Sequence, residues 1–199
     1  MKPIVNSKGF TLLELLIVII IIGILSNFAI PHYMNMQKEA RIANTKGKMA
    51  AIRGGIELAH AKIMISGNNT GPSGANPDWP TLEEVQYNEL RLSTRPESLL
   101  HLRMVRSNIF SDIQDKALPP CSLPDMTSGM TQNPSGVTYR PLADVAKTVR
   151  NSDESSCWAY YPGDERDANG RVVDAIFFVN DDRPGSDNID ASNQVPSQW

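Results

Sequence analysis

The feature that most constrains this chain is an apolar segment close to its N-terminus. Residues 10–25 are apolar except for Thr11 and Glu14, and after a short polar break the apolar residues resume up to Ile30. About 20 residues of this kind are enough to cross the hydrocarbon core of a bilayer as a helix. We therefore expect a transmembrane helix segment over residues 10–30, with the rest of the chain attached to it.

The charges that flank the apolar segment predict its orientation. Lys2 and Lys8 precede it and no acidic residue does. The positive-inside rule then places the N-terminus in the cytoplasm and everything after Ile30 outside it. A cleaved secretory signal would end in small residues after the apolar run, whereas this run ends in Ile-Pro-His-Tyr. We therefore expect the segment to be retained in the mature protein.

Glu14 is the most informative residue of the segment. A carboxylate inside an apolar span is costly to insert, and it indicates a functional site with a partner to be found. No basic residue of the segment can pair with it. The alternative is that Glu14 lies near the cytoplasmic interface and reaches water or takes up a proton.

The residues around Glu14 carry a family resemblance. The run Lys8–Ile19, KGFTLLELLIVI, resembles the prepilin cleavage and methylation motif of type IV pilins and type II secretion pseudopilins. Gly23 and Pro31 also stand where these families have a helix-loosening glycine and a kinking proline. This resemblance covers about the first 62 residues, and beyond them it is one of layout.

The resemblance implies a processing and assembly route. A prepilin peptidase would cleave between Gly9 and Phe10 and methylate the new amine of Phe10. In the filament, Glu14 of one subunit would neutralise the Phe10 amine of a neighbour, so that two costly charges become a pair and set the register. Pro31 would shape the same assembly helix.

The implied partners are identical or homologous pilin-like subunits, the prepilin peptidase, an inner-membrane assembly platform and the membrane itself. The subunit would first be a single-pass inner-membrane protein with its globular domain in the periplasm, and then part of a periplasmic or cell-surface filament. The resemblance does not separate a type IV pilus from a type II secretion system, or a major from a minor subunit. The presence of Glu14 speaks against the tip pseudopilin type, which lacks it.

The helical pattern continues past Pro31 and becomes amphipathic, which predicts one helix from about Phe10 to Ile65. Apolar residues recur at steps of three and four and predict a buried stripe: Ile42, Met49, Ile52, Ile56, Ala59 and Ile63. The charged residues lie largely off the stripe, and we interpret them as a solvated face, with contacts to other subunits as the alternative: Lys38, Glu39, Arg41, Lys46, Lys48 and Arg53.

The remaining pattern predicts an α+β fold in which the long helix packs on a small C-terminal antiparallel sheet. Residues 66–80 are rich in Gly, Asn and Pro and predict a linker, and they contain a formal glycosylation sequon at Asn68. Two short helices follow in the prediction, one after the capping box of Thr81 and Glu84 and one over residues 96–106.

Three strands are predicted in the C-terminal part, over residues 137–139, 158–161 and 172–179, with the last two joined by a turn at residues 167–170. Their aromatic residues are expected to form the core of the sheet. In sum, we expect four regions: a prepilin leader (1–9), the transmembrane segment (10–30), its amphipathic continuation (31–65) and an extracytoplasmic globular domain (66–199).

Composition limits the function. A formal net charge of -3 leaves no basic field for nucleic acid, so we expect no nucleic-acid partner. The two cysteines, Cys121 and Cys157, form no CxxC pair. In an oxidising compartment we expect them to be bridged, which would contribute roughly 3 kcal/mol, whereas in a cytosolic domain they would be ordinary buried thiols.

Metal binding and catalysis find little support in the sequence. Four aspartates of the C-terminal tail are weak candidates for a Ca²⁺ site, Asp181, Asp182, Asp187 and Asp190, and we otherwise expect no cofactor. The histidines, His32, His60 and His101, stand near no nucleophile motif, so we do not expect an enzyme. The alternative is an extracytoplasmic enzyme or binding module that is merely tethered by its N-terminus.

Overall fold

The computed structural model describes residues 9–65, 78–88, 109 and 118–199. The chain divides into two compact units, one over residues 1–39 and one over residues 40–199. The prediction of a helix at residues 96–106, the sequon at Asn68 and His101 all lie outside the described residues. Of the predicted linker, residues 66–80, the structure describes only the last three residues, of which residues 79 and 80 are buried.

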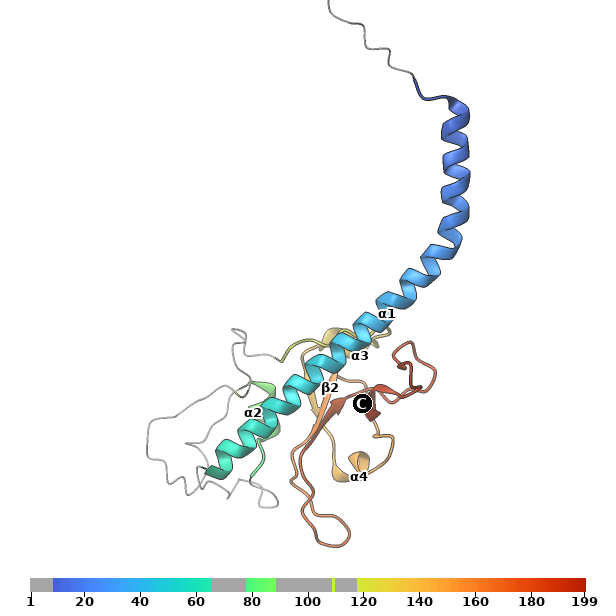
Figure 1. Ribbon diagram of the computed structural model, residues 1–199. Coiled ribbons are helices and arrows are strands. Elements are labelled where there is room, and N and C mark those ends of the chain that lie inside the picture. The colour runs from blue at the N-terminus through green and yellow to red at the C-terminus, as the bar shows by residue number, and fades with distance from the viewer. Residues whose placement is uncertain (1–8, 66–77, 89–108, 110–117) are drawn as a thin grey trace, which may run out of the picture. The chain divides into compact units, whose positions relative to one another are not determined.

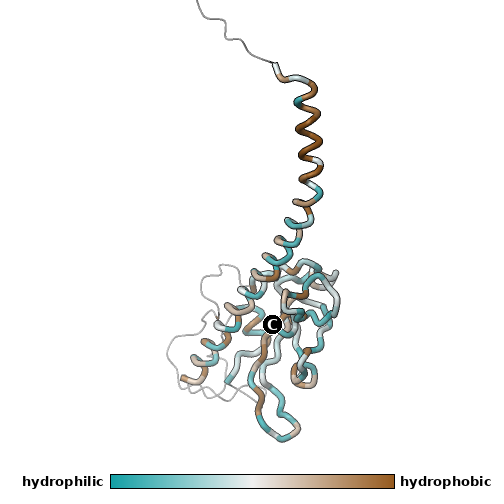
Figure 2. Tube along the Cα trace, turned by 45° about the vertical axis from the view of Figure 1, so that its right-hand side comes forward, coloured by the Kyte–Doolittle hydropathy of each residue, from teal (hydrophilic) through white to brown (hydrophobic). Residues whose placement is uncertain are grey.

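One long α-helix, α1 (Leu12–Ile65), forms the first unit from Leu12 onward and continues into the second unit. Its bounds agree with the predicted helix. Figure 2 shows apolar residues crowded along its first part and a mixture of polar and apolar residues along its second part. The helix runs through Pro31, which lacks the N–H that would donate to the carbonyl of Asn27.

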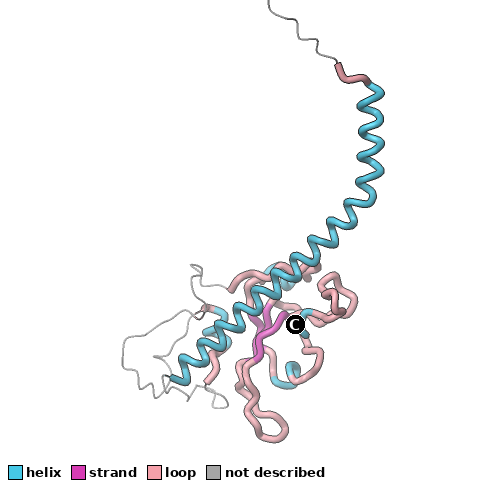
Figure 3. Tube along the Cα trace, viewed as in Figure 1, coloured by secondary structure: helices cyan, strands magenta, loops and turns pink. Residues whose placement is uncertain are grey.

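The second unit contains a small sheet of three strands, β1 (Val137–Tyr139), β2 (Trp158–Tyr161) and β3 (Ile176–Val179), in that order (Figure 3). Four short helical elements accompany it: α2 (Leu82–Gln86), α3 (Ser128–Gln132), α4 (Leu142–Val145) and the 3-10 helix η2 (Pro196–Gln198). The α+β prediction is therefore confirmed, as is the capping box of α2, in which Thr81 and Glu84 bond each other's backbone N–H.

The prediction of an antiparallel sheet is wrong in part, because the sheet is mixed. β2 and β3 are antiparallel, but β1 pairs with β2 in parallel, with Val137 opposite Trp158. The cause is the connection between β1 and β2: it includes α4 and returns the chain to the starting end of β1, as a crossover does and a hairpin does not.

The turn between β2 and β3 lies where the sequence predicts it. Gly170 has a φ of +76° and its N–H donates to Asp167, which glycine allows without strain. The last strand is shorter than predicted, because after the isolated bridge of Arg166 to Val172 the ladder does not resume until Ile176. Opposite this gap stand Pro162, which has no N–H, and Gly163, which has a φ of +76°.

The sheet is buried on both faces, because successive side chains of a strand point to opposite faces and nearly all those of β2 and β3 are buried. One set belongs to the core that includes the second part of α1: Trp158, Tyr160, Phe177 and Val179. The other set packs with Leu142 and Val145 of α4: Ala159, Tyr161 and Phe178. Figure 1 shows the second part of α1 lying across β2. The aromatic residues are sheet core, as predicted.

Candidate functional site

The candidate site begins at the junction of Gly9 and Phe10, just before α1. Both residues are exposed, and Phe10 retains 75% of its accessible surface. A Cβ atom added at Gly9 would meet nothing within 4 Å, and its φ is not in the left-handed region. The fold therefore does not require glycine at position 9, and the Gly9–Phe10 junction is exposed.

Thr11 and Glu14 form a reciprocal cap at the start of the helix. The Glu14 carboxylate accepts hydrogen bonds from the Thr11 N–H at 2.9 Å and the Thr11 hydroxyl at 2.8 Å, and the Glu14 N–H donates to that hydroxyl at 3.2 Å. This is the geometry of a capping box. Thr11 was not predicted as a partner of Glu14, because only a basic residue was expected to pair with the carboxylate, although the T-x-x-E spacing signals a cap.

The cap leaves part of the carboxylate available. Both Thr11 donors bond the same oxygen, Oε2 of Glu14. Within the part of the chain that the structure describes, Oε1 accepts no hydrogen bond. Glu14 can therefore hold its own helix start and still accept a donor from another molecule.

The first part of α1 is apolar and uncovered. The large apolar side chains from Leu12 to Ile30 are each at least 42% exposed. This is the one helix among the described residues that is long and apolar enough to cross a membrane, a finding that rests on length and composition. The hydroxyl of Ser26 donates to the carbonyl of Ile22 at 2.7 Å, so its polar group is satisfied within the helix.

The second part of α1 carries the predicted buried stripe. All six predicted residues are buried, and most of them join the main core with the sheet. A seventh, Thr45, was not predicted because it is polar. Its hydroxyl donates to the carbonyl of Arg41 and accepts from the N–H of Ser122, which satisfies it at full burial.

The interpretation of the α1 charges as a solvated face is wrong for three of them. Lys46 donates to Asp190 at 2.6 Å, and Lys48 donates to the carbonyl of Pro120 at 2.7 Å. Arg53 donates to backbone oxygens of Phe177 and Trp199. These long side chains hold the loops of the second unit to α1, which periodicity cannot show because the partners are more than 70 residues away along the chain.

The two cysteines are brought together in the second unit. Cys121 and Cys157 form a disulfide bond in the structure. Their Cα atoms are 6.1 Å apart, which is inside the range that a disulfide allows. The bridge ties the loop before α3 to the residue that precedes β2. Cys157 is fully buried and Cys121 is 5% exposed.

The four tail aspartates do not converge. Asp181 is fully buried and bonds Arg183 and Asn188, Asp182 accepts from Ser152, and Asp190 pairs with Lys46. Hydrogen bonds to Asp181 raise the pKa of Arg183. Among the described residues, no group of three or more His, Cys, Asp or Glu side chains is arranged to hold a metal ion. The calcium hypothesis gains no support from this arrangement.

Comparisons with known proteins point to the same segment. Residues 4–26 match the family model "Prokaryotic N-terminal methylation motif". The chain is 44% identical to the type IV narrow pilus major component PilA5 of Thermus thermophilus over 81 residues. This alignment covers 37% of this chain and 70% of that protein.

Two further relatives extend the comparison. A type IV major alpha-pilin of Moraxella bovis is 26% identical over 155 residues, or 75% of this chain and 80% of that pilin. The type II secretion system core protein G of Pseudomonas aeruginosa is 34% identical over 53 residues, or 27% of this chain and 37% of that protein. No solved structure matches the chain.

Proposed function

Because the chain belongs to the type IV pilin family and is a structural subunit of a pilin-type filament, we propose that its filament is a type IV pilus, into which it is built after cleavage between Gly9 and Phe10. The observation that carries the choice of system is coverage. The similarity reaches across 70% and 80% of two major pilins, against 37% of the secretion protein.

In this proposal the first part of α1 has two successive environments. The subunit waits in the inner membrane, with its N-terminus in the cytoplasm and the second unit outside, until an assembly platform extracts it. In the filament, the same exposed apolar side chains pack against the helices of other subunits. Both environments remove from water a surface that the isolated chain leaves bare.

Glu14 would act at the second stage. Cleavage after Gly9 gives Phe10 a charged amine and leaves the N–H of Thr11 in place, so the helix cap survives processing. The unoccupied Oε1 of Glu14 is then available to the Phe10 amine of a neighbouring subunit. Pairing two opposite charges in an apolar filament core sets their relative position along the axis.

The test separates the two filament systems. The gene is deleted in its native host and complemented with a tagged copy, and surface filaments are sheared off and analysed. A type IV pilin restores surface pili that contain the tagged chain. Intact surface pili in the deletion strain, together with loss of protein secretion, would instead assign the chain to a type II secretion system, the candidate favoured by the similarity to core protein G.

A further inference from the structure

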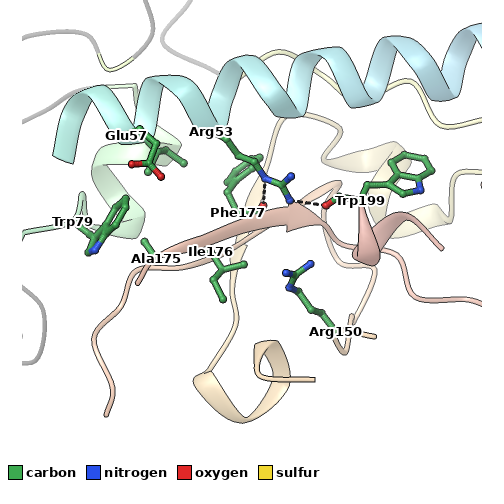
Figure 4. A pocket seen from close by; sticks show the side chains of 9 residues that line it. Arg53, Glu57, Trp79, Arg150, Ala175, Ile176, Phe177 and Trp199 are labelled. Carbon is green, nitrogen blue, oxygen red and sulfur yellow. Dashed lines mark hydrogen bonds between the residues drawn. The ribbon is translucent and has the colours of Figure 1, made fainter. Parts of the chain in front are cut away.

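The polar contacts at the pocket of the second unit are made within the chain itself (Figure 4). The pocket has a volume of about 280 Å³, and its lining includes residues of α1 and β3 together with Arg150 and Trp199. Arg53 donates through Nε to the carbonyl of Phe177 at 2.8 Å and through Nη2 to the backbone oxygen of Trp199 at 2.7 Å. These contacts hold the C-terminal segment to α1. A reactive group is found instead in the turn that leads into β3.

The connection between β2 and β3 extends beyond the sheet as the orange loop of Figure 1. Its tip is the turn that the sequence predicts at residues 167–170, and Arg166 and Val172 form an isolated bridge just before and after it. Residues 168–171 are all exposed, and neither hydrophobic core of the second unit includes any of them. The tip is therefore in contact with water and can change its conformation locally.

Asn169 has a side-chain amide that the fold does not hold. Its backbone N–H donates to Oδ1 of Asp167 at 2.9 Å, but within the described ranges no hydrogen bond involves its carboxamide. The next residue, Gly170, has a φ of +76°, and a Cβ atom added to it would meet nothing within 4 Å. The carboxamide of Asn169 can therefore rotate toward the backbone nitrogen of Gly170, which no side chain shields.

These two groups can react within the chain. The backbone nitrogen of Gly170 attacks Cγ of Asn169, and the bond from Cγ to Nδ2 breaks. The proton of the attacking nitrogen leaves with the amide as ammonia, and the product is a cyclic succinimide. Water then opens the ring at either carbonyl and leaves an aspartate or an isoaspartate at position 169. The reaction consumes water and releases ammonia, with no oxidant or reductant.

One contact opposes the reaction. The Gly170 N–H donates to the carbonyl of Asp167 at 2.9 Å, and this bond must open before the nitrogen can attack. A single exposed hydrogen bond contributes little to stability, and a turn outside the core opens without unfolding of the sheet. The contact should slow the reaction but not prevent it.

We propose that Asn169 is a site of spontaneous deamidation in the folded chain. Asparagine is a thermolabile residue, and glycine is the neighbour that shields the attacking nitrogen least. Each event adds a negative charge at the tip of the hairpin, close to Asp167 and between the exposed Arg166 and Arg171. The isoaspartate product also lengthens the backbone by a methylene group. It thereby disturbs the turn, in which Oδ1 of Asp167 accepts from the N–H groups of Asn169 and Arg171.

The test follows the full chain in a neutral detergent, kept at physiological temperature and neutral pH and sampled over weeks. Trypsin releases residues 167–171 as one peptide, because Arg166 precedes it and Arg171 ends it, and Asn169 is the only amide side chain in that peptide. Liquid chromatography with mass spectrometry separates and quantifies the unmodified, aspartate and isoaspartate forms. A sample digested at the start corrects for reaction during handling.

A synthetic peptide of residues 167–171 gives the rate without the fold. We expect the folded chain to form both products at a rate within about tenfold of that of the peptide, because only one exposed hydrogen bond must open. Gly170→Ala is expected to slow the reaction about tenfold, because a Cβ atom shields the attacking nitrogen. Thermal melting shows whether that variant folds.

Asn193 is a matched control within the same chain, and it serves even if Gly170→Ala does not fold. It is exposed and has a φ of +59°, but Gln194 follows it where glycine follows Asn169. Asn193 should remain unmodified over the period in which Asn169 reacts.

Three results would overturn the proposal. The first is an unmodified peptide from the folded chain under conditions that convert most of the synthetic peptide. The second is modification of Asn193 at the same rate as Asn169, which would mean that the glycine neighbour is not the cause. The third is formation of aspartate without isoaspartate, because direct hydrolysis of the amide gives aspartate alone and does not pass through the ring.

Discussion

Thr11 and Glu14 bond each other in both directions at the first turn of α1, and both donors of Thr11 bond one oxygen of the Glu14 carboxylate. Glu14 thus has a local structural role that does not depend on any other subunit. Helix capping and subunit pairing are separate properties of one side chain, and substitutions can separate them.

Replacing Glu14 with Gln removes the charge and keeps the cap, because glutamine also serves at this position of a capping box. We expect Glu14→Gln to reduce filament yield more than tenfold, since an unpaired charge in an apolar environment costs about 3 kcal/mol. Glu14→Leu should show the same loss while the chain stays stable and membrane-inserted. Quantitative immunoblotting of sheared filaments and membranes measures both.

Thr11→Val is the matched control for these variants. It removes the capping hydroxyl, which costs about 1 kcal/mol at a helix start, and leaves the carboxylate and its charge. Filament yield within about twofold of wild type is the expected result. If Glu14→Gln, as the sole form of this subunit, assembles like wild type while Thr11→Val does not, then capping and not charge pairing is the function of Glu14.

The disulfide should contribute strongly to the stability of the second unit. Cys121 and Cys157 are separated by 36 positions, and closing a loop of that size contributes about 3–4 kcal/mol on the chain-entropy model. We expect a reductant, or the double change Cys121→Ser and Cys157→Ser, to lower the melting temperature by about 10 °C. Circular dichroism of the full chain measures it, and the reductant should not affect the double variant. Full thiol labelling of denatured, unreduced native protein would contradict the bridge.

The pair of Lys46 and Asp190 predicts a loss of stability in acid. Burial tends to raise the pKa of Asp190, but hydrogen bonds from Lys46 and from the N–H groups of Gln194 and Ser192 outweigh it and lower the pKa below its usual value. A lowered pKa in the folded state stabilises the protein above the unfolded value, near 4, and this stabilisation is lost as the pH falls through the folded-state value.

The pair is tested by melting curves between about pH 7 and pH 2, the range in which aspartates titrate. Asp190→Asn should lower the melting temperature near pH 7 and show a smaller further loss below pH 4 than wild type. Asp174→Asn, a change at an exposed aspartate, serves as the control. Parallel curves for wild type and Asp190→Asn over the whole range would show that this carboxylate is not coupled to folding.

Much of the fold could be predicted because it depends on local patterns. The stripe from Ile42 to Ile63 follows helical periodicity, and β1 and β2 have the predicted bounds. The parallel pairing of β1 with β2 could not be predicted in this way, because it depends on where the crossover through α4 returns the chain. The same holds for Lys46 and Arg53, whose partners are set by tertiary contacts with the C-terminal segment.

The candidate site was predictable to a similar degree. Gly9, Phe10 and Glu14 stand out by residue type and spacing, and the roles assigned to them remain predictions. Thr11 was missed although its spacing to Glu14 signals a cap. The pocket at Arg53 and Arg150 has no signal in the sequence, since its lining residues come from positions between 53 and 199 and meet only in the folded unit.

The role of the tail aspartates is open to a direct test of metal removal. The carboxylates of Asp181 and Asp182 already accept hydrogen bonds from protein groups. We therefore expect EDTA, or added Ca²⁺, to leave the melting temperature of the full chain unchanged within about 1 °C, since a ligand that does not bind the folded state cannot stabilise it. A Ca²⁺-dependent rise of several degrees that Asp182→Asn abolishes would assign a calcium site to this tail.

The mass of the N-terminal peptide of the chain, taken from sheared native filaments, tests the central claim most directly. Processing at the open Gly9–Phe10 junction predicts a peptide that begins at Phe10 and carries one additional methyl group on its amine. Recovery of chains that begin at Met1, or after Ile30, from cells with an active prepilin peptidase would contradict processing at this junction and assembly through α1.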